Sequence, residues 1–170
     1  MKLSISNATA SDARALAALR TSVAHGMTQR FGAGDWSATP TEPDVVQQLS
    51  ASRVLVARRD GEMIGTVRLA RAKSWAIDAS KFTPVTTALY VLGLAVVPEA
   101  REQGVGRCLM EAAKEAARAE PADALWLDAY EHIAGAGPFY LKCGFRQVGR
   151  TSYREMPLMF YEWLCEGRYA

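Results

Sequence analysis

Residues 89–119 read LYVLGLAVVPEAREQGVGRCLMEAAKEAARA, an apolar run followed by a glycine-containing turn and an alanine-rich run. Residues 89–97 are almost wholly apolar, are partly β-branched and stop at Pro98, which predicts a buried strand. From Gly106 the apolar residues recur at helical spacing, which predicts a helix that ends near Glu120, before Pro121. The predicted buried face of this helix contains Leu109, Met110, Ala113, Ala116 and Ala117, and the opposite face contains Glu111, Lys114, Glu115 and Arg118.

The turn between the strand and the helix contains two glycines, at positions 104 and 106. The first backbone N–H groups of a helix have no partner within the helix, and the helix dipole adds partial positive charge there. Glycines lack the Cβ atoms that would keep a phosphate away from these groups, and Arg101 and Arg107 add full charges on either side. The pattern favours an anion-binding turn, with an ordinary strand–helix connection as the alternative.

The turn does not fit the two common nucleotide-binding loops. A Walker A loop requires Gly-Lys-Ser/Thr, whereas Gly106 is followed by Arg and Cys, and the dinucleotide fingerprint requires a third glycine where Leu109 stands. The run Arg101-x-x-Gly104-x-Gly106 instead resembles the pyrophosphate-binding loop of the GNAT superfamily of acyl-CoA-dependent N-acetyltransferases, whose pattern is Arg/Gln-x-x-Gly-x-Gly/Ala.

A second motif extends the resemblance. In the GNAT superfamily the helix is followed by a strand and then by a short helix with a tyrosine in a Phe-Tyr-x-x-x-Gly-Phe context. Here residues 124–130 supply the strand, and residues 139–145 read FYLKCGF. Pro138 and Gly144 suit the start and the end of a helix of about six residues. Two motifs in this order match by chance far more rarely than either motif alone.

The resemblance implies a mixed α/β fold, with a central, twisted, mostly antiparallel sheet of about seven strands, a splayed central strand pair and helices on both faces. It implies a single domain over residues 1–170. It also implies an enzyme that uses acetyl-CoA as co-substrate and transfers acetyl directly to a primary amine of a small molecule or peptide, through a ternary complex. A non-catalytic acyl-CoA-binding sensor of the same fold is the alternative.

The resemblance also implies roles for individual residues. Gly93 weakens the interior of the central strand and fits the bulge of the family, beside which main-chain amides bind the pantetheine arm and polarise the thioester carbonyl. Tyr140 is the expected general acid for the departing thiolate, because a phenol with a pKa of about 10 stays protonated at neutral pH. We expect Phe139 to pack inward and Tyr140 to face the cleft. The expected cofactor contacts are Leu94, Ala95, Val96, Arg101, Glu102, Gln103, Gly104, Val105, Gly106 and Arg107.

The central strand departs from the family pattern, because it lacks the glutamate that many members use as general base. Bases that act through water, or an acceptor that binds already neutral, are the remaining choices, and the candidate bases are Asp78, Asp128, Glu131 and His132. Asp128 and Tyr130 share one face near the carboxyl end of their strand, where open α/β sheets place ligands, with a surface ion pair as the alternative. The candidate acceptor contacts are Asp78, Asp128, Tyr130 and, in a loop expected over residues 25–41, His25, Phe31 and Trp36. Loop aromatics that fold back on the core are the alternative for that loop.

Local patterns predict the remaining elements. Thr9 and Asp12 form a candidate capping box for a helix that ends at Val23. Asp60-Gly61 suits a tight hairpin turn. Residues 75–83 are expected to form a long turn or an extended hairpin. The other predicted strands are residues 3–6, 53–58, 63–71, 146–150 and 158–164, and the other predicted helix is residues 43–49.

Composition limits the class of protein. The 170 residues are 49% hydrophobic, which suffices for one core, and 20 basic residues stand against 18 acidic ones. Basic residues are dispersed, so nucleic acid is not an expected partner. The sequence contains no apolar run of membrane-spanning length and no signal peptide, so we expect a soluble, cytoplasmic protein with no membrane partner and with a homodimer as a possible assembly. Three widely spaced cysteines predict buried free thiols rather than disulfides, a metal site or a covalent acyl intermediate.

Overall fold

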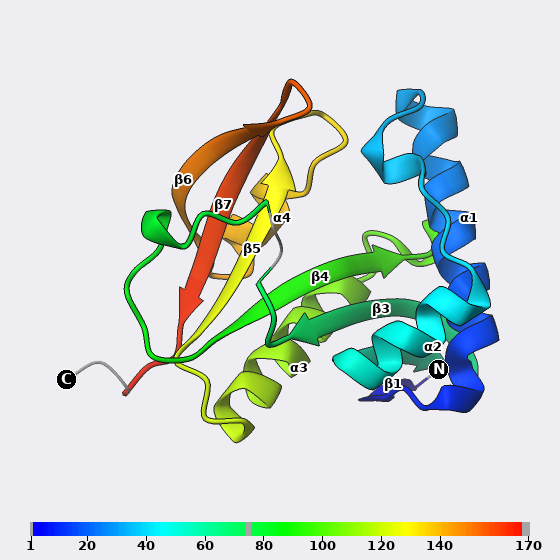
Figure 1. The fold of residues 1–170 in the computed structure, drawn as a ribbon. Coiled ribbons are helices and arrows are strands. Elements are labelled where there is room, and N and C mark those ends of the chain that lie inside the picture. The colour runs from blue at the N-terminus through cyan, green and yellow to red at the C-terminus, as the bar shows by residue number, and fades with distance from the viewer. Residues whose placement is uncertain (1, 74–75, 168–170) are drawn as a thin grey trace. The chain divides into compact units, whose positions relative to one another are not determined.

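The computed structural model describes residues 2–73 and 76–167. The strands are β1 (Leu3–Asn7), β2 (Arg53–Arg59), β3 (Glu62–Ala70), β4 (Ala88–Val96), β5 (Ala124–Tyr130), β6 (Arg146–Tyr153) and β7 (Met156–Leu164). The helices are α1 (Ala13–Phe31), α2 (Glu42–Ala51), α3 (Val105–Ala119) and α4 (Gly137–Lys142). The strands form a seven-stranded sheet in the order β1-β2-β3-β4-β5-β7-β6 (Figure 1). This arrangement confirms the predicted mixed α/β fold.

The chain divides into two compact units. The first consists of Met1–Leu69 and Gly93–Ala112, and the second of Ala70–Leu92 and Ala113–Ala170. Strand β4 and helix α3 therefore each contribute residues to both units.

In the first unit, α1 and α2 pack on one face of the β1–β2–β3 strands (Figure 1). Ala13 and Leu16 of α1 and Val45 of α2 share a core with Val54 and Val56 of β2. The two valines lie two residues apart and so point to the same face of the strand. This packing explains why the short helix α2, which could not hold its shape alone, is stable here.

Helix α1 is longer than the sequence predicted. It continues past Val23 to Phe31, so the predicted loop over residues 25–31 was wrong. Gly26 does not end the helix: a Cβ atom there would lie 3.5 Å from Cγ of Pro98, so the glycine lies in a packed position. The helix ends instead at Gly32, which has a φ of 80° and donates its N–H to the Thr28 carbonyl at 2.9 Å.

The hairpin that the Asp60-Gly61 dipeptide predicts is present. Strands β2 and β3 pair in antiparallel register, and both turn residues have positive φ angles, 51° at Asp60 and 89° at Gly61. On the other face of this hairpin the first turns of α3 pack against Gly65. A Cβ atom at Gly65 would lie 3.0 Å from Leu109 and 3.1 Å from Val105, so the glycine permits this close approach.

In the second unit, the antiparallel strands β5, β7 and β6 lie side by side (Figure 1). The segment from Ala76 to Thr87 covers one face of these strands. It contains a 3₁₀ turn at Ala79–Lys81, and its Ile77 and Phe82 enter a core with Trp126 and Phe160. The rings of Phe82 and Trp126 stack with centroids 4.4 Å apart. The part of the predicted turn over residues 75–83 that the structure describes therefore packs against the sheet through Ile77 and Phe82. Trp75 lies outside the described residues.

Strand β4 pairs with β5 over a short distance only. The parallel ladder covers three residue pairs, from Ala88 with Ala124 to Tyr90 with Trp126, although both strands continue beyond it. Three residues after this ladder ends, Gly93 has a φ of 59°, a left-handed conformation that interrupts regular pairing. The ladder thus ends just before the position where the sequence suggested a bulge.

Two side chains on α3 differ from their predicted environments. Lys114, expected on the polar face, is only 7% exposed, and its ammonium donates to the Cys143 carbonyl at 2.6 Å. This contact places a positive charge at the carboxyl end of α4, where the helix dipole favours it. Cys108, expected to be buried, is exposed, whereas Cys143 and Cys165 are buried free thiols as predicted.

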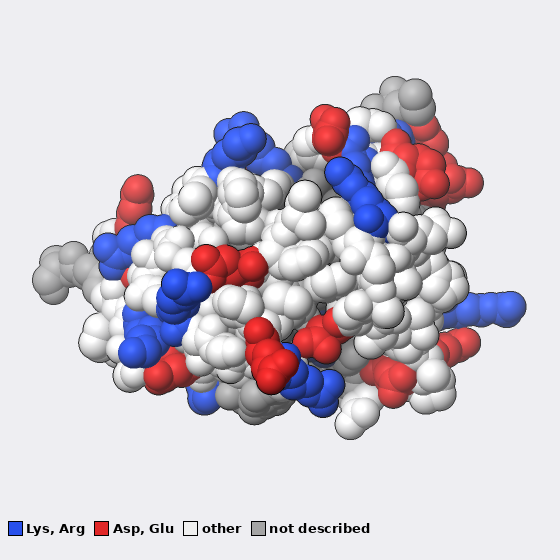
Figure 2. Space-filling view, turned by 90° about the horizontal axis from the view of Figure 1, so that it is seen from above, with Lys and Arg blue, Asp and Glu red and all other residues white. Residues whose placement is uncertain are grey.

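Charged side chains of both signs lie among uncharged residues on the face drawn in Figure 2. Within the described part of the chain, no helix combines the length and the apolar character needed to cross a membrane.

A buried carboxylate ties the covering segment to the sheet. Glu162 of β7 is 1% exposed and accepts hydrogen bonds from the Thr83 N–H at 2.9 Å and the Thr83 hydroxyl at 2.6 Å. Arg146, its cross-strand neighbour on β6, donates from Nε at 2.8 Å and from Nη2 at 2.5 Å. A buried charge is tolerated only when it is paired and hydrogen-bonded, and Glu162 satisfies both conditions.

We predict that Arg146→Ala destabilises the protein by about 2 to 3 kcal/mol, because it leaves the Glu162 carboxylate buried without a cation. Adding Glu162→Gln to this variant should recover part of the loss. Arg150→Ala is the matched control on the same strand, since the Arg150–Glu131 pair is exposed on both sides and should contribute less than about 1 kcal/mol. Urea unfolding of all variants measures the differences, and equal losses in Arg146→Ala and Arg150→Ala would contradict the prediction.

Candidate functional site

The glycine turn before α3 leaves backbone donors without helical partners. The N–H of Cys108 donates to the Gly104 carbonyl at 3.0 Å, which is the first bond of the helix. The N–H groups of Val105, Gly106 and Arg107 precede this bond and have no acceptor within the helix. Gly104 has a φ of 81°, and a Cβ atom there would meet nothing within 4 Å. Glycine is therefore needed at position 104 for its backbone conformation rather than for space.

Side chains of the turn brace it against its surroundings. The amide of Gln103 donates to the Glu99 carbonyl at 2.7 Å and accepts from Arg59 at 2.6 Å. Arg101 donates from Nε to the Val96 carbonyl at 3.3 Å. Val105 is buried, whereas Glu102 and Arg107 are exposed. The turn is thus held by hydrogen bonds to other residues of the first unit, and Glu102 and Arg107 remain accessible to solvent.

The predicted pantetheine-binding residues follow the irregularity at Gly93. Leu94, Ala95 and Val96 are all half-buried. A Cβ atom at Gly65 of β3 would lie 3.2 Å from the Ala95 carbonyl, so a side chain there would crowd the Ala95 backbone.

Tyr140 lies on α4 among other aromatic rings. It is 8% exposed, and its ring contacts those of Phe139, Phe145 and Tyr161 at centroid distances of 5.4, 6.0 and 6.0 Å. Tyr140 is the more buried of the two, because Phe139 is only half-buried. Among the residues that the structure describes, none forms a hydrogen bond with the Tyr140 hydroxyl. Burial, followed by electrostatic interaction with Asp128 and Cys143, raises the pKa of Tyr140 far above its usual value.

Asp128 and Tyr130 lie on one face of β5, as the alternation of the strand predicted. Asp128 faces Phe160 across the β5–β7 ladder and is half-buried. Burial raises the pKa of the Asp128 carboxyl, an effect only partly offset by a backbone hydrogen bond. Tyr130 is also half-buried. A partly buried carboxyl with a raised pKa is a candidate for proton transfer.

The other three candidate bases have different environments. Asp78 is exposed and caps the following 3₁₀ turn, accepting from the Ser80 N–H at 3.0 Å and the Ser80 hydroxyl at 2.7 Å, and these bonds lower its pKa. Glu131 pairs with Arg150. His132 accepts the Ala134 N–H at Nδ1 at 3.0 Å, within a surface turn. The pKa of Asp128 is thus raised by its surroundings, whereas that of Asp78 is lowered.

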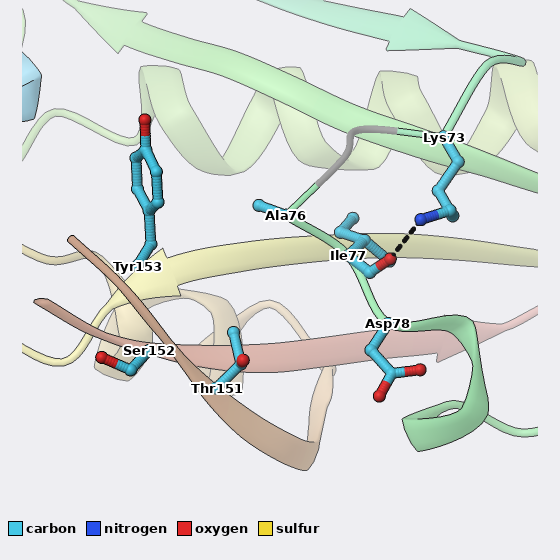
Figure 3. Close-up of a pocket in the computed structure, with 7 residues that line it drawn as sticks. All are labelled: Lys73, Ala76, Ile77, Asp78, Thr151, Ser152 and Tyr153. Carbon is cyan, nitrogen blue, oxygen red and sulfur yellow. Dashed lines mark hydrogen bonds between the residues drawn. The ribbon is translucent and has the colours of Figure 1, made fainter. Parts of the chain in front are cut away.

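Each unit contains a hollow lined by predicted site residues. In the first unit an open groove of about 870 Å³ lies between α1 and the connection before α3, and it brings His25 together with Arg101. In the second unit a hollow of about 350 Å³ is lined by Asp78 and its neighbours and by Thr151, Ser152 and Tyr153 of β6 (Figure 3). Lys73, which also lines this second hollow, donates a hydrogen bond to the Ile77 carbonyl at 2.6 Å (Figure 3).

The aromatic candidates near the end of α1 fold back on the chain. The Trp36 indole donates to the Gly32 carbonyl at 2.9 Å, and a Cβ atom at Gly34 would lie 2.6 Å from the Trp36 ring. Phe31 ends α1 and lies under the Arg30 guanidinium, 5.0 Å from ring centroid to charge centre. These contacts match the alternative in which loop aromatics pack locally.

Comparison with known families decides the classification. The model of the acetyltransferase (GNAT) domain matches residues 50–147, more than half of the chain. The chain belongs to the GNAT acetyltransferase family. It is therefore an acyltransferase. No curated protein sequence matches the chain significantly.

Solved structures confirm the GNAT fold at low sequence identity. A ribosomal-protein-alanine N-acetyltransferase from Brucella melitensis is 20% identical, with a TM-score of 0.74 over 95% of this chain and 99% of the other. The yncA protein of Salmonella typhimurium, solved with its cofactor acetyl-CoA, is 17% identical, with a TM-score of 0.75 over 100% and 98%. The PaiA N-acetyltransferase of Thermoplasma acidophilum, solved with coenzyme A, is 15% identical, with a TM-score of 0.73 over 96% and 100%.

The sequence analysis missed several polar residues in this GNAT chain. Arg20 and Arg68 lie partly buried in the first unit, and Glu162 and Lys114 are buried in the second. A signal was present for two of them: Arg20 lies one helical turn from the buried Leu16, and Glu162 interrupts an apolar strand. A charged residue at such an apolar position is expected to point inward. The residues that contact it come from segments far away in the sequence, so the sequence pattern does not identify them.

We predict that Asp128→Asn stabilises the protein at neutral pH. The raised pKa means that the folded state holds the Asp128 proton more tightly than the unfolded chain, whose pKa is near 3.8. The ionised carboxylate therefore destabilises the fold as pH rises above that value, and the penalty is absent below it. Urea unfolding between about pH 4 and about pH 8 should show an advantage of the variant that grows with pH.

Asp78→Asn is the control with the opposite sign. The lowered pKa of Asp78 contributes stability that is present above the unfolded value of 3.8 and is lost as pH falls through the folded value. This variant should be less stable than the wild type at neutral pH. The same pH slope in both variants would contradict the environments described here.

Proposed function

We propose that this GNAT protein transfers acetyl from acetyl-CoA directly to a primary amine of a small molecule or peptide, in a ternary complex and within a single catalytic domain of residues 1–170. Family membership supports acetyl transfer. The observation that carries the proposal is the set of three backbone donors, at Val105, Gly106 and Arg107, that precede the first bond of α3. Two structural neighbours were solved with acetyl-CoA or coenzyme A, which supports this choice of co-substrate.

The turn before α3 is the proposed diphosphate site. An anion there would accept hydrogen bonds from the free N–H groups and would gain from the positive end of the α3 dipole. Arg107 is exposed and adds charge, and Gln103 and Arg101 hold the shape of the turn through their backbone contacts. The proposed diphosphate contacts are Arg101, Glu102, Gln103, Gly104, Val105, Gly106 and Arg107.

The strand after Gly93 is the proposed site of the pantetheine arm. Left-handed backbone at Gly93 changes the direction of the main-chain groups that follow, at Leu94, Ala95 and Val96. Such groups can pair with the amides of the arm in the manner of an added strand. One N–H among them would polarise the thioester carbonyl, on which negative charge develops in the transition state.

The reaction forms one bond and breaks one. The neutral amine nitrogen attacks the thioester carbonyl carbon, the C–S bond breaks, and the amide and coenzyme A result. The nitrogen loses one proton and the sulfur gains one. We assign Tyr140 as the donor to sulfur, because its hydroxyl has no hydrogen-bond partner among the described residues. Its raised pKa keeps the phenol protonated before the reaction, so a proton given to sulfur must be replaced promptly from the medium.

Asp128 is the preferred candidate to take the proton of the amine, directly or through water. Its raised pKa makes the ionised carboxylate a better base than an ordinary aspartate, whereas the pKa of Asp78 is lowered. Asp78 is better suited to bind an ammonium or hydroxyl group of the acceptor, because it lines the hollow at β6. Tyr130 and Trp36 remain candidate acceptor contacts.

A non-catalytic acyl-CoA sensor is the alternative function. A sensor would need the glycine turn but would not need a proton donor. The presence of Tyr140, whose hydroxyl forms no hydrogen bond with a described residue, therefore favours the enzyme. The two functions differ in one measurement, since only the enzyme releases coenzyme A thiol in the presence of an amine.

We predict that Tyr140→Phe lowers kcat about a hundredfold and leaves the affinity for acetyl-CoA unchanged, because it removes only the proton donor. Thiol release with acetyl-CoA is to be measured across a panel of amines, amino acids and peptides with a free amino terminus, and calorimetry measures binding of acetyl-CoA. Phe139→Leu is the matched control on the same helix and should retain activity. If Tyr140→Phe equals the wild type with every active acceptor, the acid role is wrong. If wild type binds acetyl-CoA but acetylates no amine, the sensor is correct.

A further inference from the structure

An arginine on α1 has guanidinium nitrogens that are buried and lack hydrogen-bond partners. Arg20 lies one turn from both Leu16 and Ala24, which are buried, so its side chain points toward the strands. Its Nη1 donates to Oε1 of Gln48 on α2. Its Nε and Nη2 are both buried and have no hydrogen-bond partner within residues 2–73 and 76–167. The fork of the guanidinium is thus fixed on one side by Gln48 and unsatisfied on the other.

A second arginine acts on Arg20 electrostatically. Arg68 of β3 is half-buried, and its charge, after burial itself, lowers the pKa of Arg20. Burial also lowers the pKa of Arg68. Throughout residues 2–73 and 76–167, no carboxylate forms an ion pair with either guanidinium. Two partly buried cations therefore repel each other without a counter-charge.

Such an arrangement is costly unless an anion completes it. Unpaired buried charges destabilise a fold, and a buried donor without an acceptor adds a further penalty. A carboxylate matches these donors chemically, because its two oxygens can each accept from the planar fork of an arginine. The charge of the two arginines and the unsatisfied donors of Arg20 thus both call for a small anion.

The location of this arginine pair relates it to the proposed chemistry. Nη2 of Arg20 lies 3.9 Å from the position of a Cβ atom on Gly93. Gly93 is the left-handed residue that directly precedes Leu94, the first of the three proposed pantetheine contacts. An anion held by Arg20 would therefore lie beside the strand segment that is proposed to receive the thioester.

We propose that Arg20 and Arg68 bind the carboxylate of the acceptor, which makes the acceptor an amino acid or another small amino carboxylate. This inference rests on the proposed acetyl transfer. The acetyl group of acetyl-CoA carries no carboxylate, so with this donor a carboxylate must come from the acceptor. A dicarboxylic acyl group such as succinyl is the other source of the same chemistry, and the experiment separates the two.

The test compares acceptors that differ only in the carboxylate. Thiol release with acetyl-CoA is measured for free amino acids, for the matching amino acid amides and for the decarboxylated amines. We expect the wild type to prefer the free acids, and Arg20→Met or Arg68→Met to raise their KM about ten- to a hundredfold with little change in kcat. Arg14→Met is the matched control, because Arg14 is an exposed arginine on the same helix.

A binding measurement separates this inference from the proposed function. Free amino acids and their N-acetyl products should raise the melting temperature of the wild type and not that of Arg20→Met. In the absence of ligand, Arg20→Met should melt at the same temperature as the wild type or higher, because it removes an unpaired buried charge. A purely structural arginine would instead give a lower melting temperature.

The outcomes are distinct. Equal use of acids and amides by the wild type, or an unchanged preference in both arginine variants, overturns the assignment. If the variants lose only the use of succinyl-CoA, the carboxylate belongs to the acyl donor and the acceptor assignment is wrong. If no amine is acetylated, the proposed function fails, and the melting shift with amino acids alone decides whether the arginine pair binds carboxylates.

Discussion

Free backbone N–H groups at the start of α3 are the feature on which the proposed chemistry depends. Glu102 and Gly104 have left-handed backbone conformations, and these turn the chain between the end of β4 and the start of α3. Val105 and Leu109 then pack over Gly65, so the first turn of the helix is anchored to the hairpin. Donors held in this way need no reorganisation when an anion arrives, which is the condition for tight binding by backbone groups.

Local patterns predicted most elements of this fold, because strands, caps and turns depend on neighbours in sequence. Two local predictions that were wrong involve contacts with other segments. Residues 25–31 were expected in a loop, yet the helix continues through Gly26, where a Cβ atom would lie 3.5 Å from Pro98. Lys114 was expected in solvent, yet its ammonium reaches the Cys143 carbonyl, which is twenty-nine residues away along the chain. Helical spacing places a residue on a face but does not say what covers that face.

The same limit applies to the candidate site. The glycine turn and the tyrosine motif are local, and the structure shows a helix start and a short helix there. The environment of Tyr140 is only partly local, because Phe139 and Phe145 belong to the motif whereas Tyr161 comes from β7. Burial changes the acid–base character of both Tyr140 and Asp128, in each case toward the neutral form. The raised pKa of Asp128 makes its ionised carboxylate a stronger base, and the raised pKa of Tyr140 keeps its hydroxyl protonated at neutral pH.

The carboxylate of Glu162 and the guanidinium of Arg20 are both shielded from solvent, but they differ in how many of their polar atoms have partners. Glu162 has a cation and two hydrogen bonds from Thr83, so the fold itself satisfies it. Arg20 has one neutral partner, two unsatisfied nitrogens and a second cation as neighbour. Both charges carry a desolvation cost, but only the first is offset within the described chain. A cost that folding does not offset can be offset by a ligand, and the charge of Arg20 requires that ligand to be an anion.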